Sequence, residues 1–301
     1  ELTDKWLRAG SPWLIHRPSI AFDVKLGGHT EHQYEASGSR RLRVQWVPGK
    51  IVRGTAWDMP VLGYGVNTPN RLRLWSAEAP ESFDFAAFNA GNYSQAVNAQ
   101  VLSETLTKVL YPNDEMEAGQ TLRLEQQYFF VSCSLQDMIR LQLQRESNLD
   151  RFNEKFVVQL NDTHPSIAVV ELMRLLVDEY GMNWERAWSI TRKTFAYTNH
   201  TLLPEALEKW RLDLFKRVLP RHFEIICEIN ERFLDDVRIR FPGDDVRLRR
   251  MSLIDEDGAR YVRMAHVAVV GSFAVNGVAK LHSELLKSDV LKDFHEMWPE
   301  K

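Results

Sequence analysis

The first quarter of the chain alternates apolar and polar side chains in the way that is typical of β-strands. Residues 41–46 and 50–57 alternate with a period of two, and a further run ends near Trp75 after the turn formed by residues 67–70. Short strands separated by turns tend to pair with their neighbours. We therefore predict that residues 1–80 form a β-rich region with antiparallel strands.

A helical period replaces this alternation after Pro80. Apolar residues recur on one helical face between positions 88 and 110, which predicts a long helix. Residues 111–114 end it, because Pro and Asn-Asp favour a turn. A second long helix is predicted from about 126 to 144, so residues 81–150 form a helical region.

Strands and helices alternate in the remaining residues, 151–301. Residues 156–160 predict a buried parallel strand, which breaks before a helix that begins with Pro165 and ends at Gly181. After a further helix from about Asn183, residues 194–198 predict a second strand. The later predictions are a helical stretch to about 241, a hairpin between 251–254 and 261–264, and helices at 266–271 and 275–287.

The composition is that of a folded globular protein and excludes several classes of partner. Of 301 residues, 44% are apolar and 26% are charged, and 38 basic against 41 acidic side chains give a net charge of −3. This charge provides no general field that would hold a nucleic acid. No apolar run approaches the roughly 18 residues of a membrane span, so no membrane contact is predicted. Two cysteines in helical patterns and an N-terminus unlike a signal peptide predict a reducing, cytoplasmic location.

Candidate chemistry gathers where the two predicted strands end. Asp162 and His164 follow the first strand, and Asn199, His200 and Glu205 follow the second. Because ligands of α/β sheets bind beyond the carboxyl ends of parallel strands, these side chains are predicted to line one cleft. The set has many donors and acceptors and suits a neutral polyhydroxyl ligand. An alternative is purely structural, with Asp162 or Thr163 as a helix cap, Asn199 in a turn and both histidines as satisfied structural residues.

No metal site is predicted. His29 and His32 lie in a Gly-rich turn without a third ligand nearby.

The two strand-ending loops resemble signature segments of the glycogen and maltodextrin phosphorylases, the pyridoxal-phosphate-dependent α-1,4-glucan phosphorylases. The resemblance rests on residues 159–166 (QLNDTHPS) and 197–210 (YTNHTLLPEALEKW). It covers essentially the whole chain, with further matching segments at 6–13, 71–77, 109–114, 241–244, 249–253 and 274–279.

The resemblance implies an α/β fold that is part of the N-terminal Rossmann-like lobe of a two-lobe GT-B-type glycosyltransferase. It implies retaining phosphorolysis of an α-1,4-glucan (glycogen, starch or maltodextrin) by inorganic phosphate, with release of glucose 1-phosphate, in a homodimeric enzyme. The lysine that holds pyridoxal 5'-phosphate in the family is not recognisable here, so we expect the C-terminal cofactor lobe to be absent and the isolated segment to be inactive. The alternative is a stand-alone carbohydrate-binding or regulatory module.

The resemblance also implies roles for individual residues. His200 would be catalytic, at the glucosyl unit of the cleaved bond. Asp162, His164 and Glu205 would bind neighbouring sugar hydroxyls, with Asn199 in the same substrate-binding wall.

A second group matches a mobile gate over the cleft of the family. This group consists of Tyr111, the gate-loop residues Asn113, Asp114 and Glu115, and Arg123 behind them. The helix at 88–110 corresponds to the family's dimer-forming tower helix. Leu141 stands where animal members carry a second arginine, which predicts no strong nucleotide activation.

Overall fold

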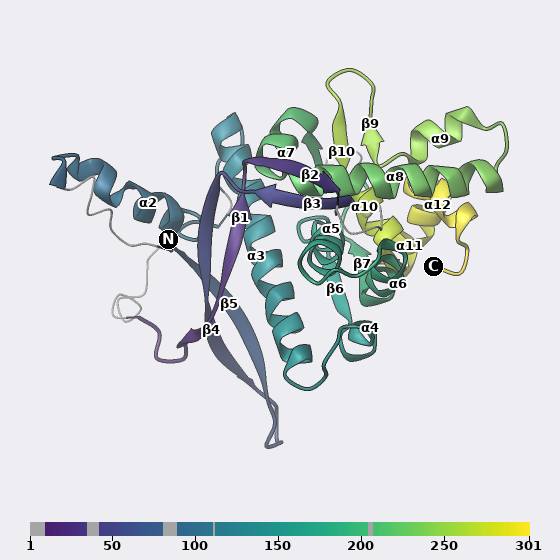
Figure 1. Cartoon of the computed structure of the whole chain (residues 1–301). Helices are drawn as coiled ribbons and strands as arrows, with labels where there is room; N and C mark the ends of the chain where they lie inside the picture. Colours follow the sequence, from purple (N-terminus) through teal and green to yellow (C-terminus); the bar gives the residue numbers. More distant parts are fainter. Residues whose placement is uncertain (1–9, 35–41, 81–88, 111, 204–206) are drawn as a thin grey trace. The chain divides into compact units, whose positions relative to one another are not determined.

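The chain has a mixed α/β fold, as predicted (Figure 1). The computed structural model describes residues 10–34, 42–80, 89–110, 112–203 and 207–301. Two compact units divide the chain: residues 1–25 and 50–133 form the first, and residues 26–49 and 134–301 form the second.

Antiparallel strands dominate the first unit, in agreement with the alternating pattern of residues 50–57 and of the run that ends near Trp75. Strands β1 (Ile15–Leu26), β4 (Lys50–Leu62) and β5 (Pro69–Glu78) form a sheet in the order β1-β4-β5. β4 and β5 pair from Arg53 opposite Glu78 to Leu62 opposite Pro69, and form a long twisted ribbon (Figure 1).

Both helices predicted for residues 81–150 exist with shifted ends. α2 spans Tyr93–Thr105, so it is shorter than the predicted helix at 88–110, of which residue 88 lies outside the described part. α3 spans Glu117–Leu143 and begins nine residues before the predicted start. The first turns of α3 contain Gly119 and several polar residues, so they show no apolar face. The hydrophobic pattern therefore did not predict them.

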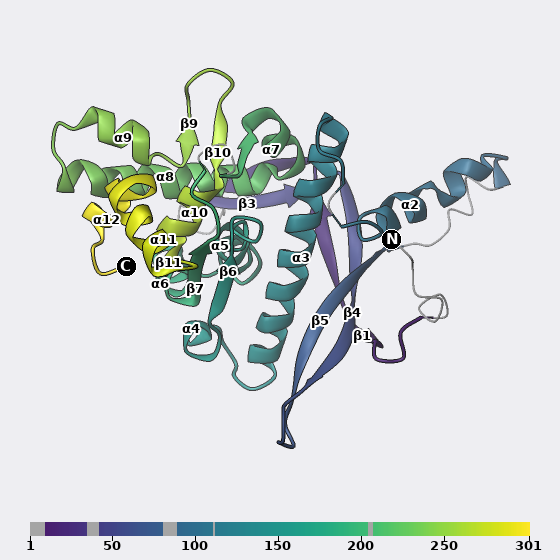
Figure 2. The ribbon, with the colours of Figure 1, turned by 180° about the vertical axis from the view of Figure 1, so that it is seen from behind.

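Three parallel strands form the central sheet of the second unit. β6 (Val158–Asn161), β7 (Phe195–Asn199) and β11 (Ser272–Gly277) lie in the order β11-β7-β6 (Figure 2). Leu160 lies opposite Tyr197, and Val275 lies opposite Tyr197 on the other side. The first two predicted strands are confirmed and pair with each other, but the helix predicted at 275–287 is wrong in its first part. A short apolar run fits either a buried strand or a helix. Here residues 272–277 form a strand because their backbone pairs with β7 on the side opposite β6.

Helices pack on this sheet and fix its loops. α6 (Trp184–Thr194) contacts β11, and α10 (Met264–Gly271) contacts β7 and β11. α6 begins where the sequence predicts, and its N-cap Asn183 accepts a side-chain hydrogen bond from the backbone N–H of Arg186 at 2.8 Å. Gly181 ends the preceding helical segment with φ of +65°. That segment comprises α5 (Ala168–Arg174) and the π-helix η2 (Leu175–Glu179), and it begins after Pro165 rather than at it.

The rest of the second unit surrounds this sheet. Its helices are α4 (Phe152–Lys155), α7 (Leu212–Val218), α8 (Pro220–Arg240), α9 (Asp245–Met251), α11 (Lys280–Leu285), the π-helix η4 (Leu286–Val290) and α12 (Lys292–Met297). Its other strands are the pair β2 (His29–Tyr34) and β3 (Leu42–Val47) and the sheet of β8 (Lys209–Arg211), β9 (Ile254–Asp255) and β10 (Tyr261–Arg263). The predicted hairpin is confirmed as β9 and β10. No helix in the described ranges has both the length and the apolar character of a membrane span.

Close packing between α10 and α5 gives a stability prediction. A Cβ atom on Gly271 would clash with both methyl groups of Val169, 2.6 Å from Cγ2 and closer still to Cγ1. Gly271→Ala is therefore expected to lower the free energy of unfolding by about 1–3 kcal/mol, measured by urea denaturation. Adding Val169→Ala makes room for the new methyl group, so the double variant should lose less than the two single losses combined. Strict additivity would contradict the proposed clash.

His266 gives a prediction about pH. Burial, helped by the charge of Arg263, lowers the pKa of His266 from 6.5 to about 4. Its ring lies edge-on to Phe294, and Nδ1 is 3.0 Å from the carbonyl oxygen of Ser252. Because the unfolded chain binds this proton at higher pH than the folded chain, stability is expected to fall as the pH drops from 6.5 towards 4.

The matched variant is His266→Gln, which retains hydrogen-bonding groups but does not titrate. Its unfolding free energy should depend less steeply on pH over this window than that of the wild-type chain. Equal slopes would show that His266 does not carry the effect.

Candidate functional site

The carboxyl ends of the three parallel strands lie at one edge of the central sheet. β6 ends at Asn161, β7 at Asn199 and β11 at Gly277, and the register places Asn161 and Asn276 on either side of Thr198. Each strand is followed by a loop, so three loops share this edge. The sequence predicted two of them.

A row of polar side chains crosses the strands just before the loops. Gln159 donates from Nε2 to Thr198 Oγ1 at 2.8 Å, and Thr198 Oγ1 donates to Asn276 Oδ1 at 3.0 Å. These contacts join all three strands through side chains in addition to the backbone ladder. The edge that carries the loops is therefore held in one arrangement.

Asp162 shapes the first loop. Its φ of +65° lies in the left-handed region, which Asp tolerates better than most residues. Its backbone N–H donates to the carbonyl oxygen of Thr198 at 2.8 Å, and its Oδ1 accepts from the backbone N–H of Thr163 at 2.6 Å. The residue thus stabilises its own turn, and the N-cap of α5 is Ile167 instead. Asp162 and His164 are both partly exposed.

The second loop places Asn199 and His200 in different surroundings. His200 is exposed, whereas the Asn199 side chain is only 1% exposed. Asn199 Nδ2 donates to the hydroxyl of Tyr197 at 3.0 Å, and its Oδ1 lies 3.0 Å from His282 Nε2. Burial raises the pKa of Tyr197, so this hydroxyl stays protonated. The sugar contact expected for Asn199 remains a prediction, and its amide is used within the protein.

The third loop, between β11 and α11, is missing from the sequence-based site. Around it, Asn276 and Gly277 at the end of β11 and His282 on α11 lie at the same edge as Thr198 and Asn199. Segment 274–279 matched the family in the sequence analysis. Because part of it was predicted as a helix, its place at the end of a third strand was not predicted. His282 lies 83 residues from Asn199 in the sequence, so no local pattern links them.

The gate-loop residues belong to the first unit. Asn113 Oδ1 accepts from the backbone N–H of Glu115 at 3.0 Å, and Arg123 pairs with Asp114 Oδ2 at 3.1 Å. Gly119, in the first turn of α3, permits this arrangement, because a Cβ there would overlap the carbonyl oxygen of Asn113. The structure thus brings Asn113, Asp114, Glu115 and Arg123 together, while Tyr111 and Glu205 lie outside the described residues.

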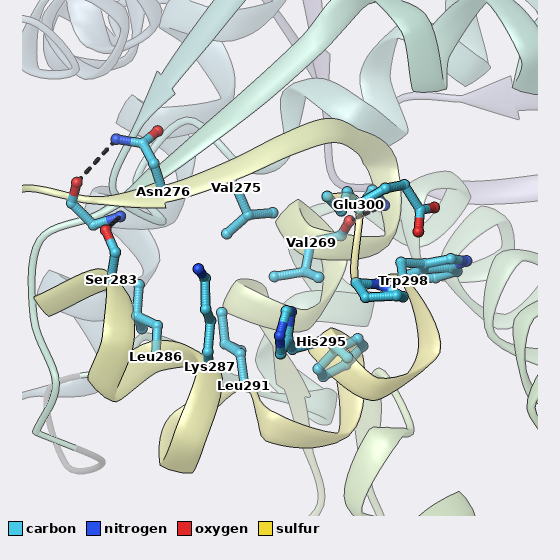
Figure 3. Close-up of a pocket in the computed structure, with 14 residues that line it drawn as sticks. Val269, Val275, Asn276, Ser283, Leu286, Lys287, Leu291, His295, Trp298 and Glu300 are labelled. Carbon is cyan, nitrogen blue, oxygen red and sulfur yellow. Dashed lines mark hydrogen bonds between the residues drawn. The ribbon is translucent and has the colours of Figure 1, made fainter. Parts of the chain in front are cut away.

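A cavity of about 380 Å³ lies beside β11, between α11, η4 and α12 (Figure 3). Val275, Lys287 and His295 point into it, and Trp298 closes one end. Within the described ranges, no group of three or more His, Cys, Asp and Glu side chains could hold a metal ion. His32 instead lies 3.1 Å from Glu224.

Comparison with known proteins decides the family. The model of the carbohydrate phosphorylase family matches residues 1–301. The chain belongs to this family. It is 62% identical to a glycogen phosphorylase of Synechocystis sp. over 301 residues, which are 100% of this chain and 35% of that protein.

Animal phosphorylases match over the same extent. The muscle form of human glycogen phosphorylase is 48% identical over 309 residues, 100% of this chain and 36% of the relative. The liver form from sheep is 47% identical with the same coverage. The chain therefore spans about a third of the length of these curated relatives. The family match includes both units, and so it covers the gate-loop residues and the loops at the sheet edge.

Proposed function

We propose that this phosphorylase-family chain supplies the glucan-binding wall of an α-1,4-glucan phosphorylase and forms part of the N-terminal lobe of its GT-B fold. One observation carries the proposal. The carboxyl edge of the parallel sheet gathers Asp162, His164 and His200, partly or fully exposed, on loops that follow adjacent strands. Ligands of α/β sheets bind at such an edge.

The side chains suit a sugar chain. A glucan presents neutral hydroxyl groups that both donate and accept hydrogen bonds, and imidazole and carboxylate groups match them. Asp162 and His164, with Glu205, are assigned to hydroxyl groups on the acceptor side. His200 is assigned to the glucosyl unit at the cleaved bond, where its backbone carbonyl oxygen faces the positive charge that develops at the anomeric carbon.

Phosphorolysis also explains why one wall suffices. A glycosidase needs two carboxyl groups on opposite sides of the bond, one of them to activate water or attack the sugar. Inorganic phosphate as the second substrate supplies the attacking oxygen in phosphorolysis. The wall then acts by binding the transition state more tightly than the ground state.

Neither lysine amine beside the cavity is placed to hold pyridoxal phosphate, the cofactor implied by the resemblance. It needs a lysine amine that can react with its aldehyde and donors around its phosphate. Lys287 lies 3.4 Å from Glu284, and Lys301 donates to the carbonyl oxygen of Val269 at 2.6 Å and lies 4.1 Å from the ring centre of Trp298. We therefore assign the cofactor to another part of the enzyme and limit the part of this chain to the glucan.

A homodimer through α2 is also part of the proposal. Val101 and Leu102 on this helix are 55% and 64% exposed. Apolar side chains that face solvent on one helix favour contact with a second copy.

The proposal is tested in a chimera in which this chain replaces the matching segment of the Synechocystis phosphorylase. His164→Ala should raise KM for maltoheptaose roughly tenfold with a small change in kcat, because it removes a hydrogen bond made in both ground and transition states. Asp162→Asn should act in the same direction. It retains the acceptor that holds the turn and removes only the charge.

His32→Ala is the matched control, since this histidine pairs with Glu224 on α8. It should leave KM unchanged. If His164→Ala and His32→Ala behaved alike, the assignment of the wall to the sheet edge would be wrong.

A further inference from the structure

We infer that His282 is a positioning residue for the loop that carries His200, acting through the amide of Asn199. The inference rests on the proposed function, in which His200 contacts the reacting sugar. His282 itself is not assigned a contact with substrate.

Asn199 connects His282 to His200. It precedes His200 directly, is 1% exposed, and is packed beside the fully buried Tyr197. A buried amide is stable only when its polar atoms have hydrogen-bond partners. Here Asn199 Nδ2 donates to Tyr197 Oη, and Asn199 Oδ1 pairs with His282 Nε2. Among the described residues, the ring of His200 makes no hydrogen bond, so the loop is anchored at Asn199.

The contacts of His282 define which of its nitrogens carries the proton. The backbone N–H of Val278 points to Nδ1 at a distance of 3.4 Å, and a backbone N–H can only donate. Nδ1 is therefore the acceptor, and Nε2–H donates to Asn199 Oδ1 at 3.0 Å. This tautomer fixes the amide, because its oxygen must face His282 and its nitrogen must face Tyr197.

Gly277 allows the imidazole to reach this position. A Cβ at residue 277 would lie 2.9 Å from Cγ of His282, closer than atoms normally approach. The backbone N–H of Gly277 also donates to Ser283 Oγ at 3.1 Å, which holds the start of α11 against the end of β11. β11 and the start of α11 thus support the loop after β7 through the imidazole ring of His282.

Loss of the donor at residue 282 has a defined consequence. Asn199 Oδ1 would be buried without this partner, and the amide could rotate. His200 would then depart from its position at the sugar by a fraction of an ångström, which affects the transition state more than the binding of a flexible glucan.

Two measurements test the inference. In the full chain labelled with ¹⁵N-histidine, His282 should give the signals of a neutral ring protonated at Nε2. In the chimera, His282→Phe should lower kcat roughly 10- to 100-fold with less than a twofold change in KM for maltoheptaose. His282→Gln, whose amide can donate to Asn199, should restore most of kcat, and Gly277→Ala should resemble His282→Phe.

Each outcome separates the inference from the proposed function. An Nδ1–H tautomer, or a kcat of His282→Phe equal to that of the active parent chimera, would overturn the positioning role. Equal loss of kcat in the Phe and Gln variants would also overturn it, because a structural role would not distinguish them. Absence of phosphorolysis in the folded parent chimera would contradict the proposed function, while the ¹⁵N signals still decide the geometry of His282.

Discussion

His200→Ala in the chimera is expected to lower kcat for phosphorolysis roughly 100- to 1000-fold, with little change in KM for maltoheptaose. The exposed ring of His200 is assigned to the glucosyl unit at the cleaved bond, so its contact strengthens as that unit distorts in the transition state. Neighbouring glucosyl units retain their own contacts, which is why affinity changes little. Steady-state kinetics of glucose 1-phosphate release measures both constants.

His29→Ala provides the control for this experiment. His29 is an exposed histidine of β2 that lies 3.5 Å from Glu31, and it belongs to the same unit as His200. Its loss should leave both constants unchanged. Near-normal turnover in His200→Ala would refute the role assigned to His200.

The second large effect is expected at a buried charge cluster between α5 and α8. Glu171 is 0% exposed and accepts from both Nε and Nη2 of Arg174, at 2.7 and 2.9 Å. It also lies 2.7 Å from Nε2 of the buried His222. Glu171→Gln removes the carboxylate charge beside the buried guanidinium of Arg174, which keeps its ion pair with Glu179 at 2.7 Å, and the free energy of unfolding is expected to fall by about 3 kcal/mol.

The pKa values in this cluster agree with that expectation. Burial alone raises the pKa of Glu171, but the charge and hydrogen bonds of Arg174 and the hydrogen bond of His222 outweigh it, so the pKa lies below its usual value. The stabilisation is therefore complete above the ordinary carboxyl pKa of 4.5 and is lost as the pH falls through the lowered folded value.

Glu228→Gln is the matched control, because Glu228 forms an exposed pair with Arg232 four residues later on α8. It should cost at most about 0.5 kcal/mol in the same urea titration. A comparable loss in both variants would show that burial does not determine the energy of the Glu171 cluster.

Local patterns predicted the elements that local forces determine. β6 and β7 were found because each is a short apolar run that ends at a polar break. Asn183 and Gly181 mark helix ends by their own side-chain and backbone properties. β11 was mistaken for a helix since its identity depends on pairing with β7, a partner far away in the sequence. The same applies to β8, which is a strand only because it pairs with β10.

The candidate site divides in the same way. Asp162, His164 and His200 could be predicted because each follows a recognisable strand. His282 could not, because its link to Asn199 depends on the order of the strands and on the missing side chain of Gly277.

Phosphorolysis by the unmutated chimera tests the central claim most directly. Under the proposed function, this chain supplies the glucan wall and the Synechocystis protein supplies everything else. If this chain is a phosphorylase segment, the chimera should release glucose 1-phosphate from maltoheptaose at a kcat within roughly tenfold of the parent enzyme. A chimera that folds and binds the cofactor but releases no glucose 1-phosphate would contradict the claim.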